Sequence, residues 1–426
     1  MPGVLAAIGV CAWAAHDDSF DYPYIPYDHA AIQYPTHATD DAVARLQQKI
    51  DSGAVKLDFD PKWGYLPSLL KHFGINTDSQ MLVFSKTSFQ GPKISPKKPR
   101  ALYFNDDVAV GFVPEGDLME FIAFDAKQGV NFYTLDREKT DKPSFVRRTD
   151  ECISCHLIPG TLNVPGLLAT SVIPGPDGSP RFAAAAVIVD SRTPLDQRWG
   201  GWYVTGTAGG LQDRGNAIAP NPDQPDALDL RGTQNLTSLT GRLDTSTYPA
   251  PTSDLVALMT LEHQTRMTNL LTRVGWETRI AMADGKLQQF HDRLDFLTTE
   301  IVAYMLFADE AQMHDPMAGV STFTETFPER GPRDRQGRSL RDFDLKTRLF
   351  RYSLSYMIYD AAFDALPDPA KNEIYRKLFD VLTGKDTSER YARLSAQDRR
   401  AILEILRDTK LGLPDYWRAA TASAGS

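Results

Sequence analysis

Two cysteines and a histidine form the stretch of this sequence whose residue types and spacing could most directly do chemistry. Cys152, Cys155 and His156 lie within "RRTDECISCHLIPG", residues 147–160, in the pattern C-x-x-C-H. With 3 cysteines and 8 histidines in 426 residues, this pattern arises by chance in roughly 4 of 10,000 such chains. The spacing is therefore a signal, and three kinds of chemistry compete to explain it.

The first two interpretations are a thiol redox pair and a zinc site. A redox C-x-x-C pair needs its first cysteine at a helix N-terminus after a buried strand, whereas "KPSFVRRTDE" precedes the motif here. A zinc site needs four ligands, but the only other cysteine is Cys11, and no histidine pair has zinc spacing. The third interpretation, covalent attachment of a c-type haem, needs only these three side chains.

The pentapeptide "CISCH" resembles the haem-binding motif of c-type cytochromes. The resemblance covers little more than these five residues. It implies one covalent haem c, attached through thioethers to Cys152 and Cys155, with His156 as the proximal iron ligand. The rest of the chain does not resemble a small all-helical cytochrome c domain, so neither that fold nor its methionine ligand is assumed.

The N-terminus carries a second, independent signal. "GVLAAIGVCAWAA", residues 3–15, is an apolar or small run that ends in an A-x-A pattern, although the usual positive segment before it is missing. Such a run is typical of a secretory signal peptide, here residues 1–15, and cleavage would remove Cys11. The sequence thus predicts export to the periplasm or cell envelope, where haem c is attached. No later stretch is long and apolar enough to span a bilayer.

The remaining chain predicts an α+β fold. Residues 16–79 suggest an arm and short helices, and short β-branched and aromatic runs over 80–208 predict an antiparallel, β-rich region that carries the motif. A long loop or boundary follows at 209–251, and 252–426 is expected to be helical. The expected helices are one that starts after an N-cap at Ser253 and others at 288–312, 341–364, 367–383 and 394–408.

The iron's distal ligand is expected on the helix after Ser253. Met259, His263 and Met267 lie on one face at spacings of four residues, and imidazole and thioether sulfur are common axial donors. His263 is the first candidate and the two methionines are alternatives, although a seam of core side chains explains the same pattern. His29 and His37 on the N-terminal arm are further candidates.

The segment "DQRWGGWYVTGT", residues 196–207, could also contact the cofactor. Arg198 could pair with a haem propionate, and Trp199, with Trp202 and Tyr203, could wall the macrocycle. A tight bend that enters a strand explains the same residues. Alternative propionate partners are Arg147 and Arg148, and the acidic run 309–315 could bind a cation.

Composition and motifs leave three functions open. The balance of 46 basic and 55 acidic residues gives no footprint for nucleic acid, and no nucleotide-binding or hydrolase motif is present. The first function is periplasmic electron transfer with a redox partner protein. The others are a haem-dependent oxidoreductase, peroxidase-like or acting on a small inorganic substrate, and a haem-based sensor.

Overall fold

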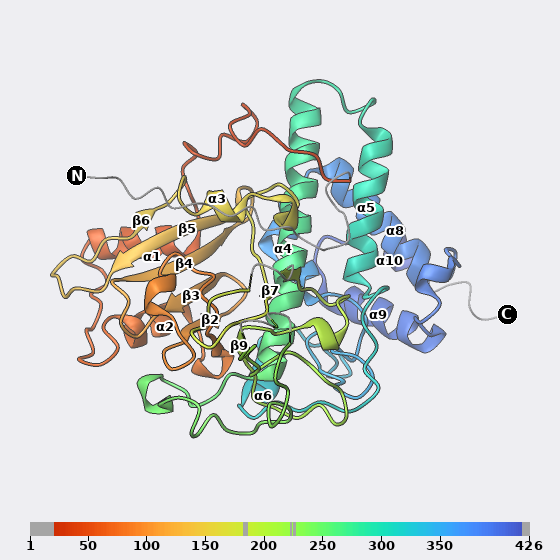
Figure 1. Ribbon diagram of the computed structural model, residues 1–426. Coiled ribbons are helices and arrows are strands. Elements are labelled where there is room, and N and C mark those ends of the chain that lie inside the picture. Colours follow the sequence, from red (N-terminus) through yellow and green to blue (C-terminus); the bar gives the residue numbers. More distant parts are fainter. Residues whose placement is uncertain (1–20, 182–185, 222–223, 225–226, 420–426) are drawn as a thin grey trace.

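A computed structural model describes residues 21–181, 186–221, 224 and 227–419. The predicted signal segment 1–15, including Cys11, lies outside these residues. The α+β class is confirmed: the first half of the chain forms an antiparallel sheet, and most helices belong to the second half (Figure 1). None of the helices in the described ranges has the length and apolar character needed to cross a membrane.

The main sheet has seven strands in the order β6-β5-β4-β3-β2-β1-β9, and every neighbouring pair is antiparallel. In the described part of the chain, a second sheet pairs β7 with β8. The strands are β1 Met81–Val83, β2 Arg100–Phe104, β3 Val108–Phe112, β4 Leu118–Asp125, β5 Gly129–Asp136, β6 Val146–Arg147, β7 Thr170–Ser171, β8 Val187–Ile188 and β9 Trp202–Tyr203.

The two faces of the main sheet have different neighbours. Along β4, Met119, Phe121 and Ala123 are buried in the same hydrophobic cluster as side chains of α1 (Ala42–Asp51) and α2 (Leu66–Phe73). The alternate residues of β4 point to the other face and remain partly exposed. This second face is where the C-x-x-C-H motif lies.

A long helix, α4 (Leu255–Ala283), runs through the middle of the molecule (Figure 1). Most of its residues are buried, because sheet, loops and other helices surround it. The remaining helices are α3 Ile153–His156, α5 His291–Met305, α6 Phe323–Glu329, α7 Ala361–Asp364, α8 Asp368–Leu382, α9 Ala396–Thr409 and α10 Tyr416–Ala419. Short 3-10 turns connect several of these elements.

The start of α4 differs by one residue from the expected N-cap. Asp254, not Ser253, accepts hydrogen bonds from the backbone N–H groups of Val256 and Ala257. Ser253 instead donates to the carbonyl of Tyr203 and accepts from the N–H of Leu82, at 2.6 and 2.9 Å. The serine therefore ties the helix entry to two strands of the sheet.

The expected helix over 341–364 is wrong, and that over 288–312 is shortened to α5. Residues 341–355 form turns and one isolated bridge between Phe343 and Phe350. These turns place the Arg341 guanidinium over the rings of Phe327 and Tyr356, at 4.7 and 4.2 Å. Packing of aromatic rings around one buried cation outweighs local helix preference here. In addition, α6 forms between the two ranges expected to be helical, 288–312 and 341–364.

The loop over 209–251 buries an acidic side chain without a cation partner among the described residues. Asp213 is 7% exposed and accepts a hydrogen bond from the N–H of Gly215 at 2.7 Å. Burial raises the pKa of Asp213 to about 7, and the Gly215 bond opposes that rise. The folded protein therefore holds a proton on Asp213 at a pH where the unfolded chain has lost it.

We expect Asp213→Asn to remove this source of pH dependence. A raised carboxyl pKa weakens the fold as pH rises from about 4 through 7, because ionisation then costs more in the folded state. The variant should gain on the order of 3 kcal/mol relative to the parent between pH 4 and pH 8. Urea unfolding of both proteins at several pH values measures this difference, and parallel curves would contradict it.

Candidate functional site

The motif folds into a single helical turn. The backbone N–H groups of Cys155 and His156 both donate to the carbonyl of Cys152, and α3 ends at His156. Residues at spacings of three and four share one side of a helix, so this turn places Cys152, Cys155 and His156 together. Both cysteines are free thiols; Cys155 is exposed and Cys152 is partly buried.

The imidazole of His156 is oriented by one hydrogen bond. Its Nδ1 lies 2.8 Å from the carbonyl oxygen of Gly166. A carbonyl oxygen can only accept, so Nδ1 carries the hydrogen and Nε2 keeps its lone pair. The ring also packs against Phe132, with centroids 4.8 Å apart. Burial lowers the pKa of His156, with the Gly166 bond acting in the opposite direction, which favours the neutral imidazole that metals bind.

The loop after α3 is shaped to present the Gly166 carbonyl. Asn269 of α4 donates to the carbonyl of Leu167 and accepts from its N–H, both at 2.9 Å. Arg273 donates to the carbonyl of Leu162, a residue with a positive φ of 61°. A Cβ on Gly166 would lie 2.3 Å from Asn269 Oδ1, so this close approach to α4 requires glycine.

Two apolar clusters hold the motif from either side. Ile122, Phe124, Cys152 and Ile153 pack on the first, whose buried members are Val130, Phe132 and Leu167. Ile153 also packs on the second, which joins Tyr34 and Val164 to Trp276 of α4.

The N-terminal arm (residues 21–37) passes close to α3 and the top of α4 (Figure 1). The Tyr34 hydroxyl donates to the Val130 carbonyl at 2.8 Å, and Asn163 donates to the Tyr22 carbonyl at 2.7 Å. The arm therefore fastens the motif's loop to the sheet.

These features fit a covalent haem better than the two other interpretations. Burial raises the pKa of the Cys152 thiol to about 11, helped by Glu120 and Glu151, whereas a redox cysteine needs a lowered pKa. Within the described ranges no group of three or more His, Cys, Asp or Glu side chains is arranged to hold a metal ion. The motif offers two thiols, one neutral imidazole nitrogen and an apolar wall, the donor set that haem c needs.

Arg198 and Trp199 lie in a buried polar cluster of their own. Arg198 forms an ion pair with Glu262 at 3.0 Å and donates to the carbonyls of Thr193 and Ser191. The Trp199 indole donates to Glu262 at 2.7 Å. Trp202 and Tyr203 donate to backbone carbonyls as well. The polar groups proposed to meet a cofactor are thus occupied by protein partners.

The structure does not bring His263 together with the motif. Its Nε2 lies 2.8 Å from the Ser355 hydroxyl, and its ring stacks on Phe307 and Tyr304 at 4.4 and 5.2 Å. Met259 and Met267 are buried in the same large cluster. The part of α4 that contacts the motif's loop instead begins six residues beyond His263, at Asn269.

We expect His263→Ala to weaken the fold without changing the absorption spectrum of the haem-loaded protein. Removing a buried ring leaves a cavity that costs about 3 kcal/mol, measured by urea unfolding. His263→Gln, which can still bond to Ser355, is the matched control and should cost less. Loss of a low-spin signal in the alanine variant would instead identify His263 as the distal ligand.

The other predicted contacts also have protein partners. Arg147 donates to the carbonyls of Tyr34 and His37 and to Asn131. Arg148 donates to the Thr134 hydroxyl. His29 Nε2 lies 3.3 Å from Asp284.

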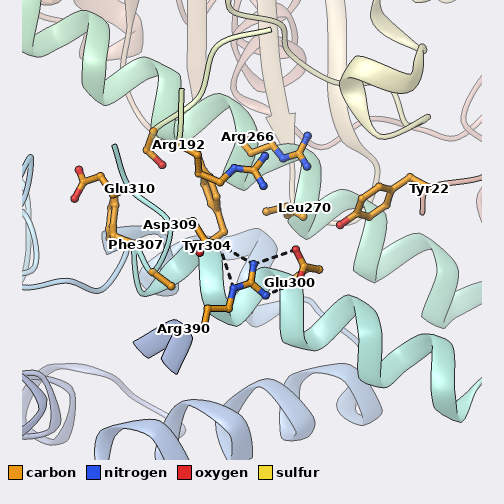
Figure 2. A pocket seen from close by; sticks show the side chains of 12 residues that line it. Tyr22, Arg192, Arg266, Leu270, Glu300, Tyr304, Phe307, Asp309, Glu310 and Arg390 are labelled. Atoms are coloured by element: carbon orange, nitrogen blue, oxygen red, sulfur yellow. Dashed lines mark hydrogen bonds and ion pairs between the residues drawn. The ribbon is translucent and has the colours of Figure 1, made fainter. Parts of the chain in front are cut away.

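The acidic run 309–315 contributes to a separate small pocket, shown in Figure 2. Arg390 forms ion pairs with Glu300 and Asp309 at 2.6 and 2.7 Å. Burial raises the pKa of Glu310 to about 7. The cavity holds about 10 Å³, enough for about one water molecule, so it has no room for an organic substrate.

Sequence reasoning missed Phe132, Gly166 and Asn269, which set the ring and nitrogen of His156. Comparison of the chain with known protein families, with curated proteins and with solved structures finds no significant match. The class of protein therefore has to be argued from the site.

Proposed function

We propose that this chain is an exported protein with one covalent haem c, held by Cys152, Cys155 and His156, and that it transfers electrons in the periplasm. The observation that carries the proposal is the bond between His156 Nδ1 and the Gly166 carbonyl, which leaves Nε2 available. A second hydrogen bond of this kind is the usual companion of a metal-binding histidine. When bound, the haem supplies one-electron redox chemistry.

The residues around the motif are compatible with electron transfer at the protein surface. Cys155 is exposed, so a group bonded to it has an edge near solvent, where a redox partner can approach. Phe132 and Gly166 restrain His156 from two sides. A ligand ring that cannot rotate needs little rearrangement when the metal changes charge, and small rearrangement favours rapid electron exchange.

A haem-dependent oxidoreductase or ligand sensor is the second candidate. It is favoured by the position of Met259, His263 and Met267 in a core cluster that excludes the motif. An iron without a distal protein ligand keeps a position open to peroxide or to a small gas.

Absorption spectra of the ferric and ferrous protein, purified from the periplasm, test the proposal and separate the candidates. We expect a mass increase of one haem that survives acid–acetone extraction. A six-coordinate, low-spin spectrum supports the electron carrier, and a five-coordinate iron that binds carbon monoxide or reacts with peroxide supports the second candidate. Full-length protein recovered from the periplasm without covalent haem would refute both.

A further inference from the structure

An ion pair on the partly exposed face of the main sheet joins β2 to β4. Arg100 Nη1 lies 2.9 Å from Glu120 Oε2, and the two side chains are 19% and 20% exposed. The other oxygen of Glu120 accepts from Ser88 and Gln90, each at 3.1 Å. The carboxylate is therefore fully engaged.

The guanidinium of Arg100, in contrast, uses only part of its hydrogen-bonding capacity. Its Nε is buried and has no hydrogen-bond partner in the described part of the chain. A buried N–H group without an acceptor destabilises the fold, because it has lost its hydrogen bonds to water without replacement. The Nε–H of Arg100 thus lacks an acceptor. A carboxylate or a phosphate is the acceptor that suits a guanidinium best.

A row of side chains leads from the motif to this ion pair. Glu120, Ile122 and Phe124 alternate along β4 and so share one face of the sheet. Ile122 and Phe124 belong to the apolar cluster that includes Cys152, and Glu120 is the next residue on the same face, on the side away from Phe124. An apolar surface therefore runs from the first cysteine toward a charged end.

Strand pairing places this row beside the motif. Ile122 lies opposite Phe132 of β5, and the Phe132 ring packs against His156 with centroids 4.8 Å apart. Glu120, together with its partner Arg100, therefore lies next along β4 to residues that surround the motif. The propionates of a haem are carboxylates, so a cation at this end of the apolar row is a suitable partner for one of them.

We infer that Arg100 binds a propionate of the haem attached at Cys152 and Cys155, an inference that rests on the proposed function. The propionate accepts from the Nε–H that lacks a protein partner, while Glu120 keeps the guanidinium in place through Nη1. This assignment replaces the expectation for Arg198, whose guanidinium is bound to Glu262 and two carbonyls. It also replaces the alternatives Arg147 and Arg148. The Nε of Arg147 is buried without a partner as well, but both of its Nη atoms already donate to protein groups and its guanidinium lies over the ring of Tyr34. The Nε of Arg148 donates to Thr134.

Resonance Raman spectra of the haem-loaded protein test the assignment, because propionate bending bands respond to a lost hydrogen bond. Arg100→Gln should shift these bands and lower the equilibrium constant for haem reduction about tenfold, since a compensating cation is removed. The double variant Arg100→Gln/Glu120→Gln leaves no unpaired carboxylate on the sheet and should shift the bands equally. Arg148→Gln is the matched control and should leave them unchanged.

The possible outcomes distinguish failure of this inference from failure of the proposed haem attachment. Covalent haem in every variant, with unchanged propionate bands in both Arg100 variants, overturns the inference and leaves the haem assignment intact. Absence of covalent haem in the unmodified protein overturns both. A band shift in the Arg100 variants alone supports the role of Arg100.

Discussion

Simultaneous replacement of Cys152 and Cys155 by alanine is expected to abolish covalent haem retention. Each thioether needs one sulfur atom, and these are the only free thiols among the described residues. Haem that binds His156 alone is held by coordination and by apolar contact, so acid–acetone should extract it completely. Intact mass and a haem stain after denaturing electrophoresis measure the loss.

Single replacements and an unrelated cysteine provide the controls. Cys152→Ala or Cys155→Ala should each keep one thioether, with a spectrum shifted by the vinyl group that remains. Cys11→Ala should retain full haem content, because Cys11 precedes the predicted cleavage site. A double variant that still carries haem after extraction would contradict covalent attachment through Cys152 and Cys155.

The second large effect is expected at the buried cluster around Glu262. Glu262 is 1% exposed and is contacted by the Arg198 guanidinium and the Trp199 indole. Glu262→Ala leaves a buried cation and a buried N–H without their acceptor, which should cost about 3–5 kcal/mol. Urea unfolding at neutral pH measures the change in the free energy of unfolding.

A double-variant cycle distinguishes loss of the ion pair from loss of packing. Arg198→Met combined with Glu262→Leu removes both charges, and the two single variants complete the cycle. The double variant leaves the Trp199 indole and the carbonyls of Thr193 and Ser191 without these partners, but it leaves no unpaired buried charge. It should therefore be more stable than Glu262→Leu alone. If Glu262→Ala costs less than about 1 kcal/mol, the buried pair has no structural role.

The part of the site that lies within five consecutive residues could be predicted from the sequence, and the part built by distant residues could not. The spacing of Cys152, Cys155 and His156 identified these three side chains as a group, but the helical turn that brings them together was not expected in a region predicted to be β-rich. Gly166 follows ten residues after His156, and its position depends on Asn269, more than a hundred residues further on. No local pattern carries that information.

The fold shows the same division between local and distant causes. Alternation of apolar residues along β4, and the periodic helices α8 and α9, follow from local pattern. His263 and Arg198 were plausible cofactor contacts by type alone. Their partners Ser355 and Glu262 come from other parts of the chain, so only the tertiary structure assigns them. The failed helix at 341–364 has a similar origin, since Arg341 forms an ion pair with Asp106 from a distant part of the chain.

The ties that hold the motif's loop also set an order for the assembly of the protein. Tyr34 reaches Val130 across 96 residues, and Asn269 reaches Leu167 across 102. Contacts between such distant residues form late, because closing large loops is slow. During that interval Leu167 is not yet held by Asn269, so the apolar cluster that partly buries Cys152 is incomplete. Under the proposed function, the thiols would then be accessible for haem attachment until the arm and α4 have met the rest of the fold.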